Sequence, residues 1–144
     1  MKIQADIIKR FENADRRFNQ LTPMFAAFVK ALDFFSDLRC PVRDVHVSTT
    51  EDPLLVLVRY RTVLIGISML CELSDRGIGT GRIVCSLEKP SFSKEKKIIG
   101  SFGFNGQGLT DHELTPGDDQ VSLEYMAPEI VLSFLHLALQ KDAA

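Results

Sequence analysis

The chain has 144 residues, 45% of them hydrophobic and 25% charged, which is the composition of one ordinary globular domain spanning residues 1–144. A domain of this length buries enough surface to fold without a disulfide framework or a structural metal. The formal net charge of −2 gives no overall attraction to nucleic acid or to an anionic membrane surface.

Residues 2–38 carry two helical patterns separated by Thr22-Pro23. Apolar side chains at spacings of three and four predict a first helix over residues 2–19 and a second that ends near Leu38. Threonine is a good N-cap and proline a good first helical residue, so the second helix should begin at this pair. The alternative is a kinked continuation of the first helix. Six of the ten phenylalanines lie in this region, and Phe25 and Phe28 are candidates either for the core or for a partner-binding or dimer surface.

Residues 44–104 have the alternation of antiparallel strands. The central stretch from Leu54 to Leu73 is long enough to span a bilayer, but Arg59 and Arg61 lie inside it and argue for strands instead. Either a tight hairpin lies near Arg59–Thr62 or one long strand bends through a bulge, and we favour the hairpin. Further strands are expected over residues 44–49, 82–88, 98–104 and 121–125, with a long polar loop between Asn105 and Gln120.

Ala127-Pro128 should open a C-terminal helix that is apolar almost all round and therefore buried on more than one side. The predicted fold is α+β: two N-terminal helices, an antiparallel sheet of about five to six strands, and one C-terminal helix packed on the same face of the sheet. Helices from both ends of the chain should then touch each other.

The sequence offers no catalytic constellation. The run Gly77–Gly81 precedes a strand and lacks the lysine of a phosphate loop, so we interpret it as part of a glycine-rich hairpin. Asp111, His112 and Glu113 are the weak candidates for a metal site, but their spacing does not match an EF-hand loop. The three cysteines, Cys40, Cys71 and Cys85, show no CxxC spacing. We expect no cofactor, thiols that pack as small hydrophobes, and a cytoplasmic location.

The leading hypothesis is a non-catalytic protein-binding module, such as an inhibitor, an immunity-type protein, a chaperone or an assembly subunit. It would act through an apolar helical surface or a sheet face, and it would be regulatory or form a homodimer. The predicted partner-binding residues are Arg59, Tyr60, Arg61, Phe25 and Phe28. The first alternative is a small-molecule binder or enzyme with a pocket between sheet and helices, walled by Phe102, Phe104 and Tyr125. The second is a nucleic-acid binder that uses the basic residues Lys9, Arg10, Arg16, Arg17, Arg59 and Arg61.

Overall fold

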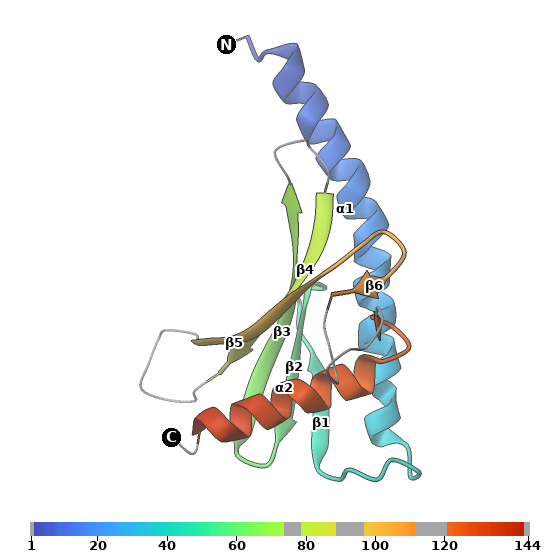
Figure 1. Ribbon diagram of the computed structural model, residues 1–144, viewed down its shortest axis with the longest axis vertical. Coiled ribbons are helices and arrows are strands. Elements are labelled where there is room, and N and C mark those ends of the chain that lie inside the picture. Colours follow the sequence, from blue (N-terminus) through green and yellow to red (C-terminus); the bar gives the residue numbers. More distant parts are fainter. Residues whose placement is uncertain (1, 74–78, 89–96, 112–120, 143–144) are drawn as a thin grey trace.

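The computed structural model describes residues 2–73, 79–88, 97–111 and 121–142. Within these residues it confirms the predicted α+β class: along the chain, a long N-terminal helix comes before an antiparallel sheet and a C-terminal helix follows it (Figure 1). The elements are α1 (Ala5–Ala31), η1 (Leu32–Ser36, a 3-10 helix), β1 (Val45–Thr49), β2 (Leu55–Tyr60), β3 (Val63–Leu73), β4 (Gly79–Leu87), β5 (Lys97–Phe104), β6 (Leu109–Thr110), β7 (Val121–Ser122) and α2 (Ala127–Asp142).

The prediction of two N-terminal helices is wrong. Helix α1 continues through Thr22 and Pro23, and only the short η1 follows it. Proline lacks the N–H for one helical hydrogen bond, but Pro23 is exposed while Leu21 and Phe25 on either side are completely buried. Tertiary packing of the apolar stripe therefore holds the helix together across the proline.

The predicted hairpin within Leu54–Leu73 is confirmed. Tyr60 pairs with Val63, so Arg61 and Thr62 alone connect β2 to β3. Arg61 has φ 54°, in the left-handed region that two-residue hairpin loops require and that glycine or asparagine usually fills. Because arginine takes this conformation here, the turn carries none of the residues by which a hairpin loop is recognised in a sequence.

The described sheet has seven strands in the order β1-β2-β3-β4-β5-β6-β7, one or two more than predicted. Each strand pairs antiparallel with the next. The additional strand, β6, has two residues and lies inside the segment predicted as a polar loop. The last predicted strand is shorter than expected, because β7 ends at Ser122 and a turn follows. Two-residue strands are too short to show an alternating pattern.

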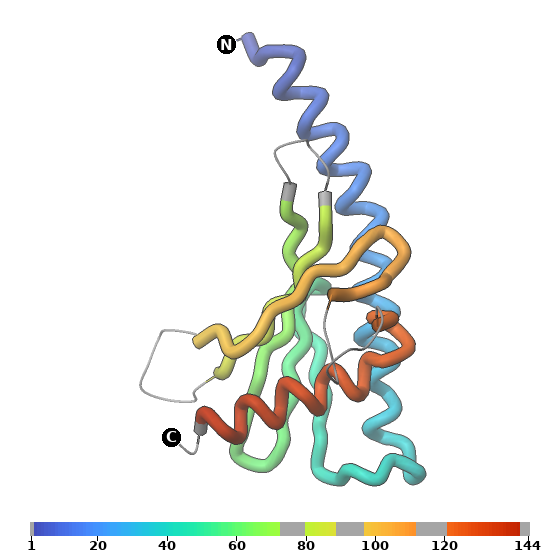
Figure 2. The backbone as a smooth tube through the Cα atoms, in the orientation of Figure 1, coloured from blue at the N-terminus to red at the C-terminus, as the bar shows by residue number. Residues whose placement is uncertain are grey.

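The core lies between the two helices and one face of the sheet. Alternate residues of the central strands, such as Ile65, Ile67 and Ile83, are completely buried there. Both α1 and α2 contact β3, and they contact each other, as predicted. The Phe134 ring of α2 stacks on Phe102 of β5 with 5.9 Å between ring centroids. Figure 2 shows that the N-terminal turns of α1 extend beyond the strand ends, so the sheet supports only part of this helix.

Candidate functional site

The first candidate site is an apolar surface at the N-terminal end of α1, formed by Ile3, which precedes the helix, and by Ile7, Ile8 and Phe11 in its first turns. We call it the N-terminal stripe. Its four side chains are 59%, 43%, 45% and 67% exposed, respectively. Scattered exposed apolar residues are ordinary, but a contiguous apolar group on a projecting helix is typical of an interaction surface.

The N-terminal stripe is a continuation of the helix face that forms the core. Apolar residues recur along α1 and at the first residue of η1 at alternating spacings of four and three: Ile7, Phe11, Ala14, Phe18, Leu21, Phe25, Phe28 and Leu32. The last four of these are at most 1% exposed, Ala14 and Phe18 are half-buried, and the first two are exposed. The sequence pattern of a buried helix face thus extends past the point where the sheet ends.

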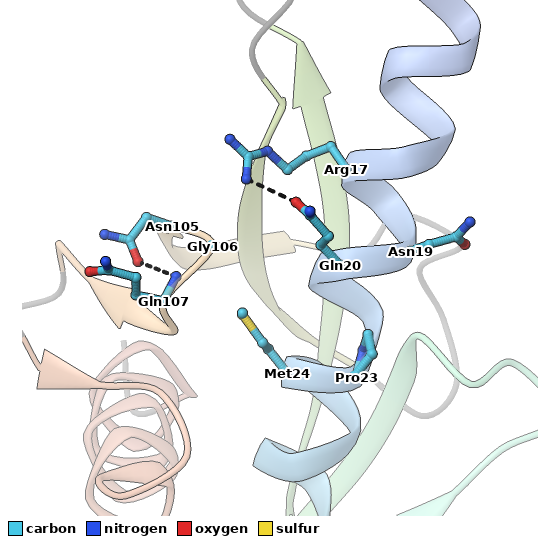
Figure 3. A pocket seen from close by; sticks show the side chains of 8 residues that line it. All are labelled: Arg17, Asn19, Gln20, Pro23, Met24, Asn105, Gly106 and Gln107. Atoms are coloured by element: carbon cyan, nitrogen blue, oxygen red, sulfur yellow. Dashed lines mark hydrogen bonds between the residues drawn. The ribbon is translucent and has the colours of Figure 1, made fainter.

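The second candidate site is an open polar groove of about 690 Å³ between α1 and the turn that joins β5 to β6 (Figure 3). Arg17 lies at its edge and donates a hydrogen bond from Nη1 to Gln20 Oε1 at 3.1 Å. A Cβ atom on Gly106 would lie 2.9 Å from Arg17 Nη1, so the guanidinium group lies against the backbone of this glycine. Any side chain at position 106 would displace Arg17.

The turn on the far side of the groove is fixed by Asn105. Its Oδ1 accepts hydrogen bonds from the backbone N–H groups of Gln107 at 2.9 Å and Leu109 at 3.1 Å. The described lining consists of one cation, the amides of Asn19, Gln20, Asn105 and Gln107, and Pro23, Met24 and Gly106. In Figure 3 Asn19 points away from the other amides. The cation and the amide N–H groups are able to donate hydrogen bonds to an acidic or amide-containing ligand, but none of the lining side chains can transfer a proton near neutral pH.

Of the three residues predicted to act together, Tyr60 and Arg61 lie close to each other, whereas Arg59 precedes Tyr60 in β2 and so points to the opposite face of the sheet. Arg59 is exposed, whereas Tyr60 is half-buried and lines a small cavity of about 170 Å³ with His136 and apolar residues of α2. The Arg61 guanidinium lies 5.7 Å from the centroid of the Tyr60 ring, and its Nη2 lies 3.8 Å from Asp44 Oδ2. This ion pair is well exposed and contributes little stability.

Of the basic residues predicted to form one nucleic-acid surface, Arg17 and Arg61 lie toward opposite ends of β3. The charge of Arg17 acts on Cys71 near the end of β3, whereas Arg61 precedes the first residue of that strand. The eight residue steps from Val63 to Cys71 span roughly 26 Å of extended strand. Burial raises the pKa of the Cys71 thiol, with a smaller opposite effect from Arg17, so this cysteine is a poor nucleophile near neutral pH.

Phe25 and Phe28, the other predicted partner-binding residues, are completely buried and stack on each other with 5.8 Å between ring centroids. In this structure they belong to the core. The exposed members of the same helix face are Ile7 and Phe11, which sequence reasoning did not single out. The position at which the sheet stops is what distinguishes the two pairs.

The remaining predicted sites do not assemble in the described part of the chain. Asp111 is exposed, and its Oδ1 accepts a hydrogen bond from the Gly103 N–H at 2.8 Å, while His112 and Glu113 lie outside the described residues. Among described residues, no three His, Cys, Asp or Glu side chains come together as a metal site would require. Phe102 and Phe104 are buried and Tyr125 is 84% exposed, so these three do not form one pocket wall.

Comparison of the chain with models of known protein families, with characterised proteins and with solved structures found no match. Within the described residues, neither helix combines the length and the apolar character that crossing a bilayer requires.

Proposed function

We propose that this protein is a non-catalytic binding module that recognises another protein through the N-terminal stripe. The observation that carries the proposal is the exposure of Ile3, Ile7, Ile8 and Phe11 on a projecting helix. A helix segment of this length is marginal in water by itself, and covering its apolar side chains with a partner would stabilise it. An apolar face with spacings of three and four is the pattern by which one helix docks against another. A cytoplasmic location fits this role and its three free thiols.

Site-specific photo-crosslinking tests this proposal. A photoreactive phenylalanine analogue replaces Phe11 in one variant and Tyr125 in a matched control, because Tyr125 is also an exposed aromatic residue but lies outside the N-terminal stripe. We expect illumination in cells to give a discrete protein adduct at position 11 and none at position 125. Equal yields of adduct at both positions would contradict a binding role for the N-terminal stripe.

A second candidate function, binding of a small acidic ligand, is favoured by the polar groove. Its single cation, Arg17, is held in place by Gln20 and lies beside backbone and amide donors. A carboxylate is the group that a guanidinium with neighbouring N–H donors binds best.

Titration with a set of simple mono- and dicarboxylates, followed by NMR of backbone amides, tests the groove. We expect shifts confined to residues near Arg17 and Asn105, and their loss in Arg17→Gln. Arg16→Gln is the matched control, because Arg16 is an exposed neighbour that does not line the groove. Shifts that persist in Arg17→Gln would rule out the groove as a carboxylate site.

A further inference from the structure

We propose that the polar groove binds a short extended peptide, with the C-terminal carboxylate of the peptide at Arg17 and its N-terminal ammonium at Glu124. The inference rests on the second candidate function, because it names the class of carboxylate that the groove takes. Three features carry it: the continuation of the groove into a second cavity, the opposite charges at its two ends, and its length.

The polar groove continues past Met24 and Gln107. These two residues also line a second cavity, of about 220 Å³, whose far wall is formed by Gly108 and residues 122–124. The backbone N–H of Leu123 donates a hydrogen bond to the Gly108 carbonyl at 2.8 Å, which joins the two parts of this wall. The two cavities therefore form one continuous site, which we call the extended groove.

One stripe of α1 forms the near wall of the extended groove. Its residues recur at spacings of three and four and so lie on the same side of the helix: Arg17, Gln20, Met24 and Ala27. In Figure 3 the side chains of the first three point toward the turn between β5 and β6. The ten residue steps from Arg17 to Ala27 rise roughly 15 Å along the helix. An extended chain rises about 3.3 Å per residue, so the extended groove has the length of about four peptide residues.

The two ends of the extended groove carry opposite charges. Arg17 lines the first cavity and Glu124 lines the second. Within the described part of the chain neither residue belongs to an ion pair, and Arg17 donates its hydrogen bond to the neutral side chain of Gln20. A complementary ligand therefore has a negative group at one end and a positive group at the other, as a free peptide does.

The middle of the extended groove suits the part of a peptide between its charged ends. Met24 is half-buried and flexible, and Leu123 is 1% exposed, so together they offer an apolar surface to a peptide side chain. The side-chain amide of Gln107 carries both donors and an acceptor, which are the groups that pair with a peptide backbone. A simple carboxylate uses none of these contacts and leaves Glu124 without a partner.

Titration with the tetrapeptide alanyl-leucyl-leucyl-alanine, followed by NMR of backbone amides, tests the inference. It should shift the amides of Leu123 and Glu124 as well as those near Arg17. It should bind at least about tenfold more tightly than acetate, because it adds apolar contact and a second ion pair. Amidation of its C-terminus should weaken binding about tenfold. Acetylation of its N-terminus should weaken binding about two- to fivefold, since Glu124 is exposed.

Matched variants assign each end of the peptide to a residue. Amidation should have no effect on binding to Arg17→Gln, and acetylation should have none on binding to Glu124→Gln. Arg16→Gln and Glu129→Gln should keep both effects, because these exposed residues do not line the extended groove. An effect of acetylation that persists in Glu124→Gln, or of amidation that persists in Arg17→Gln, would overturn the proposal.

The peptide length provides a further test. The dipeptide alanyl-leucine spans about half of the extended groove, so acetylating it should leave its affinity unchanged. An equal effect of acetylation on the dipeptide and the tetrapeptide would overturn the placement of the ammonium at Glu124.

The outcomes distinguish this inference from the second candidate function. If acetate and the tetrapeptide bind equally tightly and shift only the amides near Arg17, the peptide inference fails while the carboxylate site stands. If neither compound shifts these amides, both fail.

Discussion

At the scale of single residues, two glycines shape the core by making room for aromatic rings. Gly81 of β4 pairs with Phe104 of β5, and a Cβ atom on Gly81 would overlap that ring. Gly100 plays the same part for Phe134, whose Cε1 would lie 2.8 Å from an added Cβ. Rings from β5 and α2 thus pack directly on the backbone of the sheet, which explains glycine in strand interiors where it is otherwise unfavourable.

Replacing Gly81 by alanine should lower the free energy of unfolding by about 1–3 kcal/mol, because the ring of Phe104 must leave its place. Urea denaturation measures the change. The double variant Gly81→Ala/Phe104→Leu should cost less than the sum of its single changes, since the smaller side chain leaves space. Gly103→Ala is the control, because its nearest neighbour is the Asp111 carboxylate at 3.4 Å. Strictly additive costs would show that the ring is not the cause.

Cys85 should make the free energy of unfolding depend on pH in the alkaline range. Burial raises the pKa of its thiol to about 12, from an ordinary value of 9.0. Between these values the unfolded chain loses the proton while the folded chain keeps it, so the free energy of unfolding should fall by up to about 1.4 kcal/mol for each pH unit above 9. Urea titrations at pH 8 to 11 should show a smaller fall in Cys85→Ala than in wild type. An equal slope in the two proteins would contradict this.

At the scale of secondary structure, α1 shows how packing overrides a local stop signal. Thr22-Pro23 has the form of a helix start, yet both residues lie inside one helix of 27 residues. Buried side chains before and after the pair, Leu21 and Phe25, fix the helix on the sheet. The missing hydrogen bond at Pro23 is therefore a cost that the fold tolerates.

Pro23→Ala should raise the free energy of unfolding by about 1–2 kcal/mol, because it restores a helical hydrogen bond on an exposed side of α1. Thr22→Ala should change stability by less than about 0.5 kcal/mol, since a threonine inside a helix has no capping role. If Thr22 were an N-cap, its loss would cost about 1 kcal/mol and the proline change would destabilise. Thermal and urea denaturation of both variants separate these cases.

At the scale of the whole molecule, the sheet divides one helix face into a core part and a surface part. Phe25 and Phe11 have the same residue type on the same stripe of α1. The first is completely buried and the second is 67% exposed. Their different roles come from the length and position of β3 and β4, which are distant from both in sequence.

Phe25→Ala should lower the free energy of unfolding by about 3–5 kcal/mol, because it leaves a cavity in the core. Phe11→Ala should change it by no more than about 0.5 kcal/mol in dilute protein, because the Phe11 side chain is largely exposed in the single chain. Urea denaturation at a few micromolar makes the comparison. Similar costs for the two variants would mean that the N-terminal stripe is covered within the single chain.

Most of the fold could be predicted from local pattern. The alternation around Ile65 and Ile67 indicates a buried strand, and Arg59 and Arg61 argue for strands in place of a membrane span. The choice between a hairpin after Tyr60 and one bent strand is left open by the sequence, which favours the hairpin only weakly. Strand β6 could not be predicted, because Leu109-Thr110 is too short to show an alternating pattern. The groove at Arg17 was equally hidden, since its two walls are formed by residues about ninety positions apart in sequence.

The sequence by itself determined the α+β class, the order of most elements and the apolar face that runs the length of α1. These depend on spacings of two, three and four residues, which act between near neighbours in the chain. Only the tertiary structure decided that Thr22-Pro23 lies within a helix, that Phe25 and Phe28 are core, and that Ile7 and Phe11 are exposed. Burial is set by where distant strands end, and no local spacing encodes that position.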